Sequence, residues 1–203
     1  MKIAIAGASG RAGSCITAEL AQRGHSVTAI ARNPDRIARL ANVTAVAGDA
    51  NDRGALTRLW AGHDAAVSSI HFTASDVETL IGAAKDSGVP RYLVVGGAGS
   101  LEVAPGVRLV TTPNFPPQYK AEAEKGAAFL DQLRQEKELN WTFLSPQALF
   151  DSGTRTGKFR LGTDQLLVDS AGKSWISFED FAVAMADEIE RPAHIRTRFT
   201  VGY

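Results

Sequence analysis

The stretch Met1-Lys2-Ile3-Ala4-Ile5-Ala6-Gly7-Ala8-Ser9-Gly10-Arg11-Ala12-Gly13-Ser14-Cys15 decides the fold of this chain. Residues 3–6 form a short apolar run that predicts a strand, and apolar side chains recur at helical spacing over residues 16–23. Between the two stand Gly7, Gly10 and Gly13. Glycines in this order let the backbone turn tightly off a strand, approach a pyrophosphate and pack a helix against the strand. A tight turn without a ligand is the alternative, because three glycines alone are weak evidence.

The start of the predicted helix adds an electrostatic argument for a ligand. Its first N–H groups have no partner inside the helix, and the positive end of the helix dipole points the same way, so both favour an anion. We therefore predict a dinucleotide phosphate site at this turn. Its candidate residues are Gly7, Ser9, Gly10, Arg11, Ala12 and Gly13.

Charge and composition argue against several classes of protein. The 203 residues carry 22 basic and 22 acidic side chains without a basic cluster, so we expect no nucleic acid and no membrane partner. No apolar run approaches the roughly 18–20 residues that span a bilayer, and the chain opens on a strand instead of a signal peptide. Cys15 is the single cysteine, which fits a reducing compartment. We expect one cytoplasmic domain over residues 1–203, a monomer or weak homodimer, without a metal site.

The next part of the chain alternates predicted strands with predicted helices. The strands cover residues 25–31, 43–47, 65–70 and 91–95, and the helices cover 34–40, 53–60 and 76–87. The strands are apolar runs without a two-residue alternation, which is typical of a parallel sheet covered on both faces. This predicts a Rossmann-like, doubly wound α/β domain, in which ligands lie beyond the carboxyl ends of the strands. The candidate binding residues at those ends are Arg32, Asp49, Ser69, His71, Gly96 and Gly97.

Two of these residues bear on the choice of dinucleotide. In folds of this kind an acidic residue about 20 residues past the glycines binds the ribose 2′-OH, while an arginine accommodates a 2′-phosphate. Here Arg32 stands at that place, and Arg11 could close on the same phosphate from the other side. We therefore predict a preference for NADP(H), with NAD(H) possible. Asp49 could bind adenine, but capping the helix over residues 53–60 is its simpler interpretation.

The pattern changes after Ser100. Residues 101–118 form a long segment with four prolines, followed by a predicted helix over 119–138 and a strand over 141–144 that leads to Pro146. A second irregular stretch covers 146–163, Ser177 and Asp180 begin a helix over 181–190, and residues 198–202 predict a final edge strand. Long connections in a compact domain are usually functional. We expect the substrate side near residues 101–118 and 146–180.

Several of these segments together resemble a known superfamily. The glycine stretch 7–13, Gly48-Asp49, the run 94–101, the run 141–146 and Ser177-Phe178-Glu179-Asp180-Phe181-Ala182 are similar to the atypical short-chain dehydrogenase/reductases. The similarity is greatest to the NAD(P)H-binding flavin reductase group, and extends to biliverdin-IXβ/flavin reductase and to NmrA-like regulators. It covers nearly the whole chain, and it implies a Rossmann fold that binds NAD(P) with a small-molecule hydride acceptor beside it. FMN, FAD or riboflavin would then be candidate substrates.

One departure from that superfamily concerns the catalytic groups. Classical members use a Ser, together with a Tyr and a Lys separated by three residues on a helix, to protonate a carbonyl oxygen. Here Ser100 follows the fifth strand and Tyr119 begins a helix, but Ala123 stands where the lysine belongs and Lys120 points to another side. We keep Ser100 and Tyr119 as the catalytic candidates. A flavin or quinone can take its proton from solvent, so the missing lysine favours such an acceptor or no catalysis.

Three functions therefore stay open at this stage. The first is an NAD(P)H-dependent reductase of flavin or quinone-like acceptors, with the nicotinamide near Ser100 and Pro146 and a pocket lined by Phe115, Tyr119 and Phe150. The second is a non-catalytic NAD(P)-binding redox sensor. The third, and least favoured, is a sugar-nucleotide epimerase or dehydratase, which would normally need the Tyr/Lys pair and a larger C-terminal part.

Overall fold

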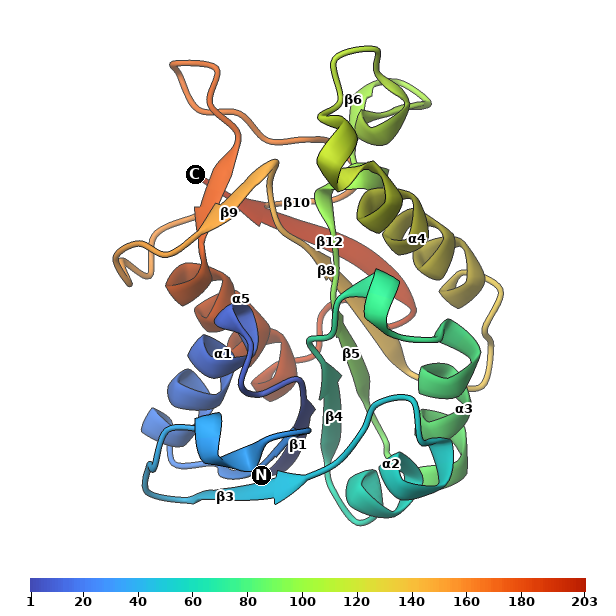
Figure 1. The fold of residues 1–203 in the computed structure, drawn as a ribbon. Coiled ribbons are helices and arrows are strands. Elements are labelled where there is room, and N and C mark those ends of the chain that lie inside the picture. Colours follow the sequence, from blue (N-terminus) through green and yellow to red (C-terminus); the bar gives the residue numbers. More distant parts are fainter.

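The computed structural model describes residues 1–203 and contains an eight-stranded sheet with helices on both faces (Figure 1). The strand order is β10-β12-β8-β5-β4-β1-β2-β3, and all neighbours are parallel except β10 and β12. The strands of this sheet are β1 (Lys2–Ala6), β2 (Ser26–Ala31), β3 (Val43–Ala47), β4 (Ala65–Ser68), β5 (Tyr92–Val95), β8 (Trp141–Ser145), β10 (Arg160–Gly162) and β12 (Thr197–Gly202). The predicted doubly wound, mainly parallel α/β fold is confirmed.

The helices form two layers. α1 (Arg11–Gln22) and α5 (Phe178–Glu190) cover one face of the sheet, while α2 (Arg53–Trp60), α3 (Val77–Ser87) and α4 (Pro117–Leu133) cover the other (Figure 1). Short 3-10 helices are η1 (Pro34–Arg36), η2 (Phe72–Ala74), η3 (Ala98–Ser100) and η4 (Leu109–Thr111). None of the helices is both long and apolar enough to cross a membrane.

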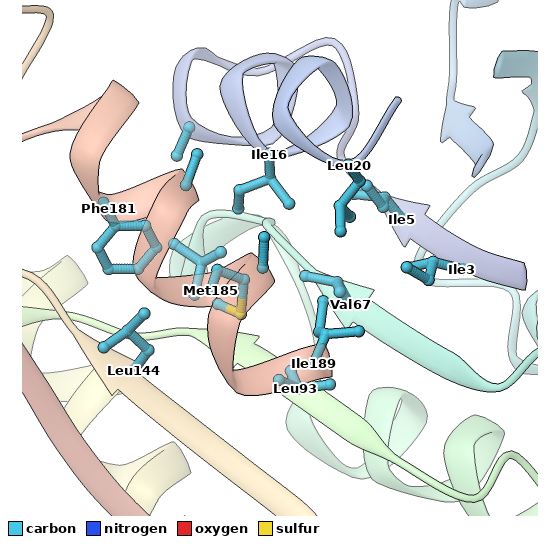
Figure 2. Close-up of a cluster of buried hydrophobic side chains, with 14 of the residues drawn as sticks. Ile3, Ile5, Ile16, Leu20, Val67, Leu93, Leu144, Phe181, Met185 and Ile189 are labelled. Carbon is cyan, nitrogen blue, oxygen red and sulfur yellow. The ribbon is translucent and has the colours of Figure 1, made fainter. Parts of the chain in front are cut away.

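Strand β1 shows how the sequence builds both cores at once. Successive side chains of a strand point to opposite faces, so Ile3 and Ile5 enter the cluster under α1 and α5. Figure 2 shows these two side chains beside Ile16 and Leu20 of α1 and Met185 and Ile189 of α5. Ala4 and Ala6 face the other way, toward the cluster that holds Trp60, Tyr92 and Phe143. Both faces of the strand are therefore buried, which explains why its sequence is a continuous apolar run.

Two predicted elements are wrong. Residues 34–40 do not form a helix beyond η1, because Ile37 leaves helical geometry (φ −86°, ψ 130°) and buries its side chain in the core under α1. The final strand is not an edge strand, because β10 pairs antiparallel with β12 and covers it. Three residues of β10 with no apolar periodicity carried too little signal to be predicted.

The two irregular segments contain further short elements. The first holds a hairpin of β6 (Glu102–Ala104) and β7 (Val107–Arg108), and the second holds β9 (Leu149–Asp151), which pairs with β11 (Trp175–Ser177). The helix predicted over 181–190 begins three residues earlier, at Phe178, with Ser177 as its cap as expected. Cys15 is half-buried, and burial raises the pKa of its thiol, in keeping with a small packing side chain.

A glycine pair tests how far the first turn depends on close backbone contact. Gly7 and Gly24 both have a φ of 83°, but a Cβ on Gly7 would lie 2.1 Å from the Ser69 carbonyl oxygen whereas a Cβ on Gly24 would meet nothing within 4 Å. Gly24→Ala should lower the free energy of unfolding by only about 1–2 kcal/mol, because a residue with a Cβ is strained in the left-handed conformation. Gly7→Ala should lower the free energy of unfolding by about 1–3 kcal/mol more than Gly24→Ala, because its Cβ would also overpack the turn. Urea unfolding of both variants measures the difference, and equal losses would contradict it.

Candidate functional site

The glycine turn after β1 is held by contacts between backbone atoms. A Cβ on Gly13 would lie 2.2 Å from the Gly7 carbonyl oxygen, so neither Gly7 nor Gly13 can carry a side chain without movement of the turn. Gly10 differs, because its backbone is extended (φ −77°, ψ 168°) and a Cβ there would be 3.2 Å from Gly7 O. Gly7 and Gly13 therefore shape the turn, while Gly10 keeps its outer side open.

The start of α1 presents a set of unused hydrogen-bond donors. The backbone N–H groups of Ser9, Arg11, Ala12 and Gly13 have no hydrogen-bond partner in the protein, whereas Gly7 and Ala8 donate to Ile30 O. No acidic side chain stands in the first turn of α1, and its cap residue, Gly10, supplies no side-chain acceptor. Unpaired donors at the positive end of a helix fit a phosphate group. The residues that the sequence predicts for a pyrophosphate thus lie together with their amides unpaired, and their role toward a pyrophosphate stays a prediction.

Basic side chains lie at the carboxyl end of β2. Arg32 follows the strand directly, is exposed and forms no side-chain hydrogen bond or ion pair. Arg36, at the end of η1, is also exposed and unpaired, and sequence reasoning overlooked it. Its position on a single turn after Pro34 was the signal that could have found it. This end of the site therefore offers two cations and no carboxylate directly after β2.

Asp49 lies at the neighbouring edge, after β3. Its carboxylate accepts a hydrogen bond from the Asn51 amide at 2.9 Å, which closes a local turn. The cap of α2 is Asp52, which accepts from Ala55 N at 2.9 Å, so the interpretation of Asp49 as that cap is wrong. Asp49 is exposed beside the nucleotide edge, where its role toward adenine stays a prediction.

The loop after β4 is fixed from two sides. Ser69 donates its amide to Ala6 O at 2.8 Å, and its carbonyl oxygen lies directly over Gly7. Glu122 of α4 accepts hydrogen bonds from the amides of Phe72 (2.7 Å) and Thr73 (2.8 Å) and lies 3.3 Å from His71 Nδ1. Burial opposes ionisation of Glu122, but the hydrogen bonds from Thr73 and Phe72 prevail and lower its pKa. The ionised carboxylate thus ties the His71 loop to α4.

The loops after β5 and β8 lie side by side at the same edge. Gly96 donates its amide to Leu144 O at 2.8 Å, and a Cβ there would lie 2.3 Å from the Phe143 ring. Gly97 has more room, since its nearest neighbour would be the Phe72 ring at 3.5 Å. Pro146 is buried just past β8. These residues form a floor of backbone and small side chains at the carboxyl edge, between the glycine turn and α4.

The two catalytic candidates are not brought together. The Tyr119 side chain is on the first turn of α4, 62% exposed, and forms no hydrogen bond. Ser100 is only 4% exposed, and its hydroxyl is buried without a hydrogen-bond partner. Ala123, at the place of the missing lysine, packs so closely on η3 that its Cβ would lie 2.7 Å from a Cβ on Gly99. The lysine position of the classical enzymes is therefore held by a short, half-buried alanine packed beside the Ser100 turn.

The segment after β8 holds a contact that the sequence did not indicate. The Arg11 guanidinium pairs with Asp151 at the end of β9 and lies 4.7 Å from the centroid of the Phe178 ring. Phe150, proposed to line the acceptor pocket, instead packs against Phe178 and Phe181 with ring centroids 4.4 Å and 4.8 Å apart. Phe150 thus belongs to the core under α1 and α5, whereas Phe115 is half-buried in the first irregular segment.

Fold and glycine turn together define a Rossmann-type nucleotide-binding protein. The chain belongs to the NAD(P)H-binding family, which it matches over residues 7–192. It is 42% identical to the uncharacterized protein YwnB of Bacillus subtilis over 209 aligned residues, which cover 99% of this chain and 98% of YwnB. The family match confirms the part of the resemblance that implied an NAD(P)H-binding family.

Two solved structures share the whole fold. The "putative epimerase" of Bacteroides thetaiotaomicron is 39% identical with a TM-score of 0.95, over 100% of this chain and 96% of that one. SP1627 of Streptococcus pneumoniae, a "putative NADH-flavin reductase", is 34% identical with a TM-score of 0.85, over 100% and 99% of the two chains. The likeness thus extends over both irregular segments as well as the nucleotide half.

Gly10 offers a test of the phosphate site that leaves the fold intact. Its backbone is extended, and a Cβ there would lie 3.2 Å from Gly7 O, a tight contact that a shift of a few tenths of an ångström relieves, so Gly10→Val should stay folded with only a small loss of stability in urea. The branched side chain would stand over the unpaired amides and should lower NADPH affinity by at least about 100-fold, since backbone approach to the phosphates is blocked. Ala18→Val, on an exposed position of the same helix, is the control. Calorimetric binding that persists in Gly10→Val would show that the loop is only a turn.

Proposed function

We propose that this protein is an NAD(P)H-dependent reductase that transfers a hydride to a flavin or quinone-like acceptor. The observation that carries the proposal is that an alanine, Ala123, packed against Gly99, stands where a classical acid catalyst has its lysine, so that the exposed Tyr119 has no cation at that position to activate it. Reduction of a ketone generates a basic alkoxide and needs a positioned acid. A flavin or quinone spreads the charge over a conjugated ring, so water can supply the proton.

The residues present fit a dinucleotide, and each has a limited task. The unpaired amides of the glycine turn would hold the pyrophosphate. The floor formed by Gly96 and Gly97 would let the nicotinamide end lie close to the backbone. The bound NADPH supplies the hydride, and the protein contributes orientation and exclusion of water. Tyr119 and the half-buried Phe115 remain the aromatic groups proposed to face the acceptor.

The epimerase name of one structural relative points to a different chemistry, which the site does not favour here. Such an epimerase oxidises a sugar hydroxyl to a ketone and reduces it again, and this requires a base whose pKa is lowered by a nearby cation. Tyr119 has no such cation, because Lys120 pairs with Glu124 (Nζ to Oε1, 4.0 Å) on the exposed side of α4. A redox sensor without catalysis would retain the same nucleotide turn, so activity separates it from a reductase.

The choice of dinucleotide gives the first test of the proposed function. Arg32→Ala should weaken NADPH binding by about 1–3 kcal/mol, the range of a charge-assisted hydrogen bond, and leave NADH binding nearly unchanged. Arg36→Ala should act in the same direction. Arg191→Ala removes an exposed arginine at the far end of α5 and controls for net charge. Isothermal titration calorimetry checks the four proteins, and equal wild-type affinities for NADPH and NADH would exclude the preference.

The second test concerns the acid catalyst. Wild-type protein should oxidise NADPH when FMN, riboflavin or a quinone is added, whereas a sensor would bind NADPH and leave it reduced. If Tyr119 only shapes the acceptor side, Tyr119→Phe and Ser100→Ala should each lower kcat less than about tenfold, because general acid catalysis is worth about 100-fold or more. Stopped-flow measurement of nicotinamide oxidation decides this. A hundredfold loss in both variants would restore a conventional carbonyl reductase.

A further inference from the structure

The ion pair between Arg11 and Asp151 connects the nucleotide turn to the segment after β8. Arg11 is the first residue of α1, and its side chain is 67% exposed, while Asp151 ends β9 and is 52% exposed. The amino-terminal ends of α1 and α5 both face the segment that carries β9 (Figure 1). Phe178 is the first residue of α5, and the guanidinium lies over the face of its ring. Arg11 is thus held at the edge of the site by a carboxylate and an aromatic face.

The backbone and the side chain of Arg11 serve the same kind of ligand. Its amide is one of the unpaired donors of the turn, and its guanidinium is a planar, bidentate anion binder. The Arg11 guanidinium is paired with Asp151. A phosphate bound at these amides would be a second negative group beside the same guanidinium and would compete with Asp151 for it. Ion pairs between exposed side chains are weak, so a phosphate held by several donors can displace one.

The anchoring of the neighbouring residues allows this exchange. Gly153 donates its amide to Glu179 at 2.8 Å, and the amides of Thr156 and Gly157 both donate to Asp180 at 2.8 Å. These bonds fix the chain beyond residue 152 to α5. Asp151 precedes them, and the same Oδ1 that pairs with Arg11 accepts from Ser152 N at 2.7 Å, so the exposed guanidinium can leave while Ser152 continues to hold the carboxylate.

We propose that Asp151 is an internal competitor for the anion-binding guanidinium of Arg11, which a phosphate group of the bound ligand takes over. The inference rests on the proposed function only in assuming that a phosphorylated ligand enters this edge. That phosphate comes either from the dinucleotide or from a phosphorylated acceptor such as FMN. In both cases the phosphate that takes over Arg11 is one held beside the amides of the glycine turn, in place of the 2′-phosphate that the sequence analysis expected beside this guanidinium.

The test replaces the competitor by its neutral counterpart. Asp151→Asn keeps an acceptor for Ser152 N but loses the charge, and should tighten NADP⁺ binding about three- to tenfold. Arg11→Ala should weaken binding, and adding Asp151→Asn to Arg11→Ala should bring no further gain, since the competition needs both partners. Glu138→Gln, an exposed acid at the opposite edge of the sheet, controls for net charge. Isothermal titration calorimetry of these proteins with NADP⁺ measures binding without turnover.

A second arm identifies the source of the phosphate. FMN and riboflavin differ only in a phosphate, so binding of each to NADP⁺-saturated protein reports on an acceptor phosphate alone. If the acceptor supplies it, Asp151→Asn should tighten FMN several-fold and leave riboflavin unchanged. Unaltered affinities for NADP⁺, FMN and riboflavin in Asp151→Asn would overturn the proposal. Tighter NADP⁺ binding without any flavin reduction would support it while refuting the reductase function.

Discussion

The approach of the backbone at Gly7 to the backbone at Ser69 and Gly13 is the constraint on which the nucleotide half depends. Atoms that would be about 2 Å from a Cβ leave no space for one, so β1, β4 and α1 can converge only where glycine stands. This convergence has two consequences. It points the first turn of α1 at the carboxyl edge of the sheet, and it leaves four amides there without partners. Tight packing and the anion site therefore have the same cause.

A second close approach, on the other face, governs the chemistry. α4 lies against η2 and η3 through small residues, because a Cβ on Gly126 would be 2.7 Å from the Phe72 ring and Ala123 meets Gly99. Glu122 adds hydrogen bonds to the loop after β4. The helix that carries Tyr119 is thus held close to η3, with Ala123 where a classical acid catalyst has its lysine. Without that lysine, α4 offers no cation that would activate Tyr119 in the classical way.

The parts that could be predicted from the sequence are those with a repeated physical signal. Buried parallel strands such as β1 and β5 are apolar on both faces, and Ser177 is a serine at a helix start, so both were recognisable. Short elements carry no such periodicity, which is why β9, β10 and η1 were missed or extended. Phe150 could not be assigned either, because an aromatic side chain beside a loop looks the same whether it faces a ligand or packs on Phe178. The Arg11–Asp151 pair joins residues far apart in sequence, and only the fold brings them together.

The segment after β8 combines a buried anchor with an exposed edge. Asp180 is fully buried, and it receives the amides of Thr156 and Gly157 together with the Tyr203 hydroxyl at 2.6 Å. A buried carboxylate satisfied by several donors is costly to disturb, so this part of the loop stays in place when a ligand enters. The stretch ahead of that anchor is exposed, with the apolar Leu149 and the charged Asp151 both on β9. Across the edge of the sheet, the hairpin β6–β7 contributes further exposed apolar side chains, Val103 and Val107. These exposed residues can therefore vary without disturbing the buried donors around Asp180 or the backbone contacts of the glycine turn.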